Sequence, residues 1–175
     1  MAKEDRPIDL RKVVVDTGPL INVLCLTFVM SSPTHEYRLE QSNVLPLYLR
    51  HNPTKERYLL ELFDSIQTIL ITSHVIGELT GRLKVSKLPL REFWLSSEDY
   101  LTGKNVDERL LSLIEICGSD RGRESLRAIG PTDSGLIELA LQEKCVLLTD
   151  DERTLARRAW DLGLGDQCKL VRNLL

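Results

Sequence analysis

Short runs of apolar, often β-branched residues alternate along the chain with longer stretches in which apolar residues recur every three or four positions. The short runs cover Lys12–Asp16, Thr68–Thr72, Cys145–Thr149 and Cys168–Val171. Their apolar character predicts strands, and the β-branched run Lys12–Asp16 predicts a strand that is fully buried. Alternation of such strands with amphipathic helices predicts the α/β class, as a three-layer α/β/α protein with a central parallel sheet.

The stretches with helical spacing follow the strands in order. They cover residues 19–26, 55–66, 73–83, 106–118, 121–128, 131–144 and 152–163. Residues 88–103 fit neither the helical nor the strand period. Prolines at 33, 46 and 53, set among polar residues, predict a loop or insertion over 31–53. The length of 175 residues fits one ordinary domain over 1–175.

Composition predicts a soluble, cytoplasmic protein. The longest apolar-rich run, residues 18–30, has roughly two-thirds of the length of a membrane span, so we expect no membrane contact. The charged N-terminus is unlike a secretory signal peptide. The four cysteines have neither CxxC spacing nor the setting of a small secreted framework, which predicts free thiols in a reducing compartment.

Five carboxylates stand at positions where ligands bind in a parallel sheet. Asp16 ends the first predicted strand, and Asp150 and Asp151 follow the third one. Ligands of such sheets bind beyond the carboxyl ends of the strands. Asp133 and Glu78 occupy positions on the apolar faces of their helices, where a core residue is expected. Burial of an unpaired charge is costly, so we expect these carboxylates to share one site at the edge of the sheet.

Each carboxylate also has an ordinary structural alternative. Asp16 fits a turn or a cap, and Asp133 fits a first-turn acid favoured by the helix dipole. Glu78 fits an i,i+4 ion pair with Arg82. One of the two aspartates after the third strand is expected to cap the following helix, which begins near Glu152.

A cluster of carboxylates either takes up protons or binds cations. His35, His51 and His74 are scattered, and no His or Cys set has zinc spacing. An all-oxygen site suits Mg²⁺ or Mn²⁺, which supports hydrolysis of phosphodiester bonds.

The segments "VVVDTGPLI", "TSHVIGEL" and "PTDSGLIELALQEKCVLLTDDERTLARRA" together resemble the PIN-domain nuclease family, in the family's order and over most of the chain. The resemblance implies a metal-dependent endoribonuclease, a hydrolase that leaves 5′-phosphate and 3′-hydroxyl ends. Its VapC-type members are toxins of toxin–antitoxin pairs, which would make an antitoxin protein and a second copy of the chain partners.

Carried over by position, the resemblance assigns the catalytic and metal-binding acids to Asp16, Glu78, Asp133 and Asp151. Thr17 and Thr149 match the family's supporting hydroxyl residues. Asp150 remains a further candidate ligand, acting through water, with helix capping as its alternative role.

Basic residues near the same edge are candidates to hold an RNA backbone. They are Arg82, Lys84, Arg121, Arg123, Arg127 and Arg153, and ordinary solvated helix surface is the alternative for each. Aromatic residues make up only 5% of the chain, so base stacking is not expected to dominate recognition.

Three other classes of function compete with a nuclease. A catalytically silent PIN-like binding or scaffold module would have the same fold. A HAD-like Mg²⁺-dependent phosphatase also uses strand-end aspartates, but it needs a second Asp two residues after the first, where this chain has Gly18. A receiver domain needs paired acids after its first strand, and only Asp16 is present there.

Overall fold

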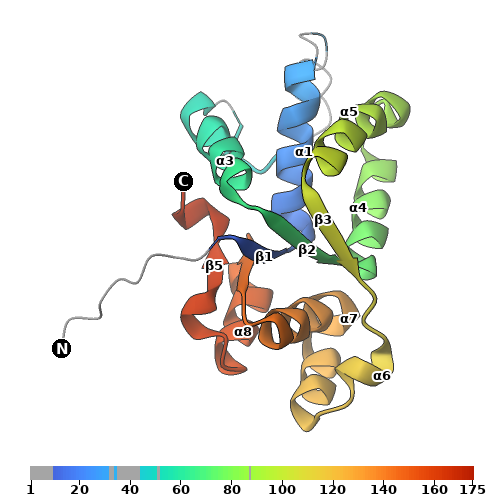
Figure 1. The fold of residues 1–175 in the computed structure, drawn as a ribbon, viewed down its shortest axis with the longest axis vertical. Helices are drawn as coiled ribbons and strands as arrows, with labels where there is room; N and C mark the ends of the chain where they lie inside the picture. Colours follow the sequence, from blue (N-terminus) through green and yellow to red (C-terminus); the bar gives the residue numbers. More distant parts are fainter. Residues whose placement is uncertain (1–9, 32–33, 35–43, 51, 87) are drawn as a thin grey trace, which may run out of the picture.

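The computed structural model describes residues 10–31, 34, 44–50, 52–86 and 88–175. Five parallel strands form one sheet in the order β3-β2-β1-β4-β5 (Figure 1). The strands are β1 Lys12–Val15, β2 Thr68–Thr72, β3 Asn105–Arg109, β4 Val146–Thr149 and β5 Cys168–Leu170. Helices cover both faces of this sheet, which confirms the expected three-layer α/β/α architecture.

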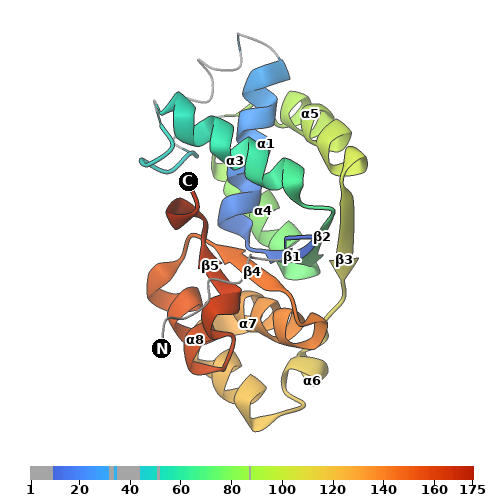
Figure 2. The same ribbon diagram turned by 60° about the vertical axis from the view of Figure 1, so that its left-hand side comes forward.

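The order of the strands explains how the helices divide between the two faces. The chain moves from β1 outward to β2 and β3, and it then returns to β4 and β5 on the other side of β1. Right-handed crossovers therefore place the helices before and after β3 on opposite faces (Figures 1 and 2).

One layer holds α1 Thr17–Ser31, α3 Pro53–Ser65, α4 Ser73–Val85 and α5 Leu90–Gly103. The other layer holds α6 Leu113–Ile116, α7 Asp120–Glu143, the π-helical turn η1 Glu152–Ala156 and α8 Arg157–Asp161. Short 3-10 turns η2 Gly165–Gln167 and η3 Val171–Asn173 flank β5. No helix among the described residues is both long and apolar enough to span a membrane.

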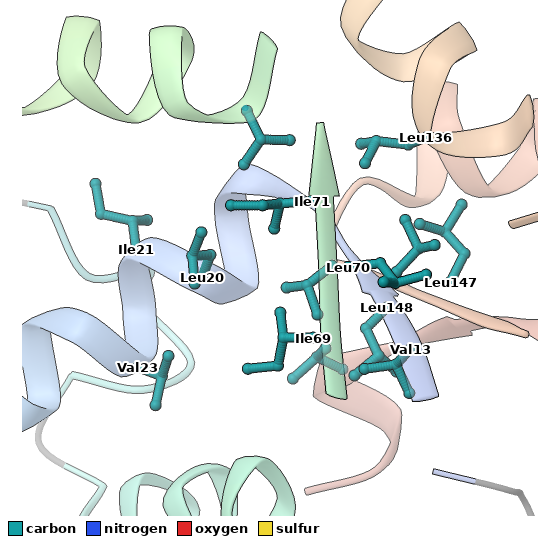
Figure 3. Close-up of a cluster of buried hydrophobic side chains, with 14 of the residues drawn as sticks. Val13, Leu20, Ile21, Val23, Ile69, Leu70, Ile71, Leu136, Leu147 and Leu148 are labelled. Carbon is teal, nitrogen blue, oxygen red and sulfur yellow. The ribbon is translucent and has the colours of Figure 1, made fainter. Parts of the chain in front are cut away.

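The core lies between the sheet and both helical layers. Figure 3 shows side chains of β2 with Leu20 of α1 on one side and Leu136 of α7 on the other. These two leucines are fully buried, and each such burial stabilises the fold by about 1.5–3 kcal/mol. Helix α1 is apolar around most of its circumference because it packs against α3, α4 and α5 as well as the sheet.

The four strands expected from the apolar runs are confirmed, but the helix predicted over 106–118 is wrong. Its first half forms β3, an edge strand paired with β2, and its second half contains the single turn α6. Charged residues of β3, such as Asp107 and Glu108, resemble the polar face of a helix in the sequence. Charge is common on edge strands because it blocks pairing with other chains.

Two further segments become defined in the structure. The ambiguous residues 88–103 mostly form α5. The helices expected over 121–128 and 131–144 are halves of α7, which breaks at Gly130, where φ is +81°. Within 31–53, expected to be a loop or insertion, residues 47–50 form a turn, while 32–33, 35–43 and 51 lie outside the described residues.

A close approach between α6 and α7 depends on Gly122. A Cβ at this position would stand 1.7 Å from the carbonyl oxygen of Ile116, which is backbone and cannot move aside cheaply. Gly122→Ala should therefore destabilise the protein by about 1–3 kcal/mol, measured by urea unfolding. Gly81→Ala is the matched control, since a Cβ in α4 meets nothing within 4 Å and should stabilise by about 0.5–1 kcal/mol. Equal stability of the two variants would contradict this packing.

Candidate active site

The carboxyl ends of β1 and β4 form the topological switch point of the sheet. Connections leave these neighbouring strands toward opposite faces, and this opens the crevice where ligands bind in open α/β sheets. Asp16 follows β1 at this point, and its backbone N–H donates to the carbonyl of Leu148 at 3.0 Å. The β1–β4 pairing therefore continues up to Asp16 and sets its side chain beside the end of β4.

Thr149, the last residue of β4, connects Asp16 to the turn that follows. Its hydroxyl donates to Asp16 Oδ2 at 2.7 Å and accepts from the backbone N–H of Asp151 at 2.9 Å. Thr149 is fully buried and Asp16 is only 8% exposed, so water competes little for these bonds. The expected supporting role of Thr149 has a direct geometric basis.

Thr17 makes the corresponding connection to α4. Its backbone N–H donates to Asp16 Oδ1 at 2.6 Å, and its hydroxyl donates to Glu78 Oε2 at 2.7 Å. Both oxygens of Asp16 thus accept hydrogen bonds, which favour its charged form. Burial outweighs them and raises the pKa of Asp16, and the nearby Glu78 charge adds to the increase.

Asp133 lies three residues after the break in α7 and meets the other carboxylates from the opposite face of the sheet. Burial, followed by the charges of Asp16, Asp151 and Glu78, raises its pKa to about 7. The charges of acids from β1, α4 and the β4–η1 turn therefore all act on Asp133 of α7. We call Asp16, Glu78, Asp133 and Asp151 the acidic cluster.

Asp150 lies apart from the acidic cluster. Its Oδ2 accepts from the hydroxyl of Tyr48 at 2.7 Å and from Nδ2 of Asn22 at 3.1 Å. Burial raises the pKa of Asp150, while the Tyr48 hydrogen bond and the Arg172 charge oppose the increase. The helix cap is Asp151, whose Oδ1 accepts from the N–H of Thr154 at 2.9 Å, so capping by Asp150 is wrong.

Among the described residues, Arg82 supplies positive charge to the acidic cluster. Arg82 Nη2 lies 3.2 Å from Glu78 Oε1, which is the i,i+4 pair expected as the alternative role of Glu78. The same guanidinium lowers the pKa of Asp16 and Asp133 against the stronger effect of burial. Glu78 thus takes part in a surface ion pair and in the buried hydrogen-bond network at once.

The donors of the acidic cluster fit a hard divalent cation, because all are carboxylate oxygens. Burial and, after it, the charges of three neighbouring acids raise the pKa of Asp133, and a cation would relieve both effects. Within the described part of the chain, no three His, Cys, Asp or Glu side chains are arranged to hold a metal ion. Binding would therefore need the carboxylates to draw together. His74 is half-buried near the start of α4, and His35 and His51 lie outside the described residues.

Three of the six expected RNA-binding residues form hydrogen bonds or ion pairs within the protein. Arg82 pairs with Glu78, and Arg121 donates to the carbonyl of Leu162 at 3.2 Å. Arg123 donates to the carbonyl of Cys117 at 2.7 Å and pairs with Asp120. The others are exposed on α4, α7 and η1 without a hydrogen bond or ion pair to any described residue: Lys84, Arg127 and Arg153. The side chains of these three residues are therefore available to bind phosphate groups.

The sequence reasoning missed Tyr48 and Asn22, the partners of Asp150. Asn22 is 3% exposed inside the otherwise apolar α1, and a lone amide in such a run is the signal that could have identified it. Tyr48 lies in the segment interpreted as a loop or insertion, and only the folded chain brings it to the edge of the sheet.

Fold and site together define a three-layer α/β/α protein with an acidic cluster at its switch point. Comparisons with models of known protein families, with curated proteins and with solved structures found no match to this chain.

The shifted pKa of Asp133 predicts how stability varies with pH. The pKa rises on folding from 3.8 to about 7, so the folded chain holds a proton that the unfolded chain releases between these values. The free energy of unfolding should fall as pH rises through this window, with a slope for this one proton below about 1.4 kcal/mol per pH unit. Asp133→Asn should lack this decrease and exceed the wild type in stability above pH 7.

Urea unfolding from pH 4.5 to 8 in EDTA measures the effect. Asp99→Asn, which removes an exposed carboxylate from α5, should leave the pH dependence of the wild type intact. Parallel curves for Asp133→Asn and wild type would show that Asp133 is not held among repelling charges.

Two half-buried tyrosines should respond differently to loss of the hydroxyl. Tyr48→Phe removes the bond to Asp150, and hydrogen bonds to charged groups contribute about 1.5–3 kcal/mol. Tyr100→Phe removes a buried hydroxyl that has no hydrogen-bond partner among the described residues, so it should be neutral or stabilising. Urea midpoints of both variants test this contrast. A Tyr48→Phe protein as stable as wild type would contradict the anchoring of the 47–50 turn.

Proposed function

We propose that this protein is a metal-dependent ribonuclease whose catalytic residues are Asp16, Glu78, Asp133 and Asp151. The supporting observation is the meeting of four carboxylates from separate elements at the switch point of the sheet. Thr17 connects Asp16 to Glu78 through its backbone N–H and its hydroxyl, and the Thr149 hydroxyl connects the carboxylate of Asp16 to the backbone N–H of Asp151. A purely structural role would not require so much repelling charge in one partly buried place.

In the proposed mechanism each residue has a distinct task. Thr17 and Thr149 hold Asp16 with both oxygens hydrogen-bonded, so its carboxylate is fixed in direction. In the metal-free cluster Asp133, with a pKa of about 7, holds a proton at its carboxylate oxygen near neutral pH, and it would release that proton when a cation binds. Mg²⁺ or Mn²⁺ bound by the acidic cluster would supply activation of water and stabilisation of the leaving oxygen.

The substrate is the less direct part of the proposal. RNA is favoured by the family resemblance and by exposed arginines and lysines near the site, including Arg153 just after Asp151. The toxin role, with an antitoxin protein and a homodimer, rests on the resemblance alone, while a cytoplasmic location is favoured by composition and cysteine spacing. Toxicity on expression that a neighbouring reading frame suppresses would support it.

A second candidate function is a binding or scaffold module without catalysis. Two observations favour it: Arg82 already supplies positive charge to Glu78, and no three described carboxylates are arranged to hold a metal. In this alternative the Arg82–Glu78 ion pair, rather than a metal ion, offsets the negative charge of the acidic cluster. Calorimetric titration with Mn²⁺ distinguishes the ribonuclease from the non-catalytic module, since the module would bind no metal at the acidic cluster.

The direct test is cleavage of a mixed RNA pool by the purified protein with Mg²⁺ or Mn²⁺. Asp16→Asn and Asp133→Asn should each reduce the rate about 100-fold or more, because each removes a charge that the reaction needs. Asp99→Asn, with the same chemical change on α5, should cleave like the wild type. Equal cleavage by all four proteins would identify a contaminating nuclease and defeat the assignment.

A further inference from the structure

Helix α8 and the turn η1 before it expose an aromatic ring beside two arginines. Trp160 is 60% exposed, and Arg153 and Arg157 are exposed on the same surface. The spacings of four and three residues make them neighbours along the helical surface, while Leu155 and Ala159 on the opposite side are fully buried. We call Arg153, Arg157 and Trp160 the Arg–Trp stripe.

The two arginines of the stripe are not paired with acidic residues of the described chain. Neither Arg153 nor Arg157 makes a hydrogen bond or ion pair with a described residue. Nearby acids are engaged elsewhere, since Glu152 pairs with Arg172 and Glu124 pairs with Arg158. Asp161 is exposed next to Trp160 and leaves the stripe with a net positive charge.

The stripe begins at the acidic cluster. Arg153 is two residues from Asp151, and Trp160 follows seven residues after Arg153, about two helical turns further from the cluster. Arg121 of α7 reaches the carbonyl of Leu162 and adds a third positive charge at the far end. A strand lying on this surface would therefore pass from Trp160 toward the proposed catalytic residues.

We propose that the Arg–Trp stripe binds single-stranded RNA, with one base stacked on Trp160 and phosphates on Arg153 and Arg157. A duplex keeps its bases stacked inside, so an exposed indole ring favours an unpaired strand. A membrane surface or a protein partner would call for a broader apolar area, and the residues around Trp160 on this surface are charged. The proposal deepens the proposed ribonuclease function by naming a surface outside the acidic cluster that holds the substrate strand, and it rests on that function.

Binding is measured in EDTA, with a gel to verify intact RNA. The chain has two tryptophans, so Trp94→Phe leaves Trp160 as the single indole reporter. A twelve-residue oligouridine should quench its fluorescence, and a blunt RNA duplex should not. Trp160→Ala in otherwise wild-type protein should weaken binding about fivefold to a hundredfold, while Trp160→Tyr should retain most of it because a ring remains.

Salt dependence tests the arginines separately. Arg153→Ala with Arg157→Ala should lower the slope of log affinity against log salt by about 1.4, or about 0.7 for each lost phosphate contact on a single strand. Arg57→Ala with Arg91→Ala removes equal charge from α3 and α5 and should leave the slope unchanged. Thermal melts confirm that every variant is folded.

The inference is overturned if Trp160 is not quenched, if the duplex or lipid vesicles quench it as strongly, or if the control pair changes the slope equally. Cleavage is assayed separately with Mg²⁺ or Mn²⁺. Stripe-dependent binding without cleavage would reject the ribonuclease and leave the binding surface. Cleavage that is unchanged in Trp160→Ala and in the double arginine variant would reject the stripe and leave the ribonuclease.

Discussion

The hydrogen bond from Thr149 to Asp16 is the interaction on which the edge of the sheet depends. A carboxylate that is 8% exposed must find partners inside the protein, and Thr149 and Thr17 provide them. Thr149 can do so only because β4 pairs with β1 in parallel and in this register. The same hydroxyl accepts from Asp151, so the position of the fourth acid follows from the position of the first.

Repulsion among the acids is the second constraint. Burial and three neighbouring charges raise the pKa of Asp133 to about 7, and Arg82 compensates only part of this charge. Such an arrangement stores unfavourable electrostatic energy that protons or a cation can relieve. The protein thus holds a site whose ionisation changes near neutral pH, a property found more often at functional sites than in structural networks.

Two adjacent aspartates after β4 take different roles because successive side chains leave the end of a strand in opposite directions. Asp150 turns toward Asn22 of α1 and Tyr48, on the face that holds the first helical layer. Asp151 caps η1 in the other helical layer, and its charge is one of those that raise the pKa of Asp133 of α7. Asp150 thus holds the 47–50 turn through Tyr48, while the adjacent Asp151 belongs to the acidic cluster.

The sequence by itself determined the strands β1, β2, β4 and β5 and the residues at their ends, because short apolar runs that alternate with longer helical patterns favour a parallel sheet. It also identified Asp16, Glu78, Asp133 and Asp151 as misplaced charges on apolar elements. Only the tertiary structure decided that Asn105–Arg109 is a strand, since pairing with β2 overrides a local pattern that fits a helix equally well. The partners of Asp150 and the exposure of Trp160 were decided there too, because both depend on contacts between residues far apart in the chain.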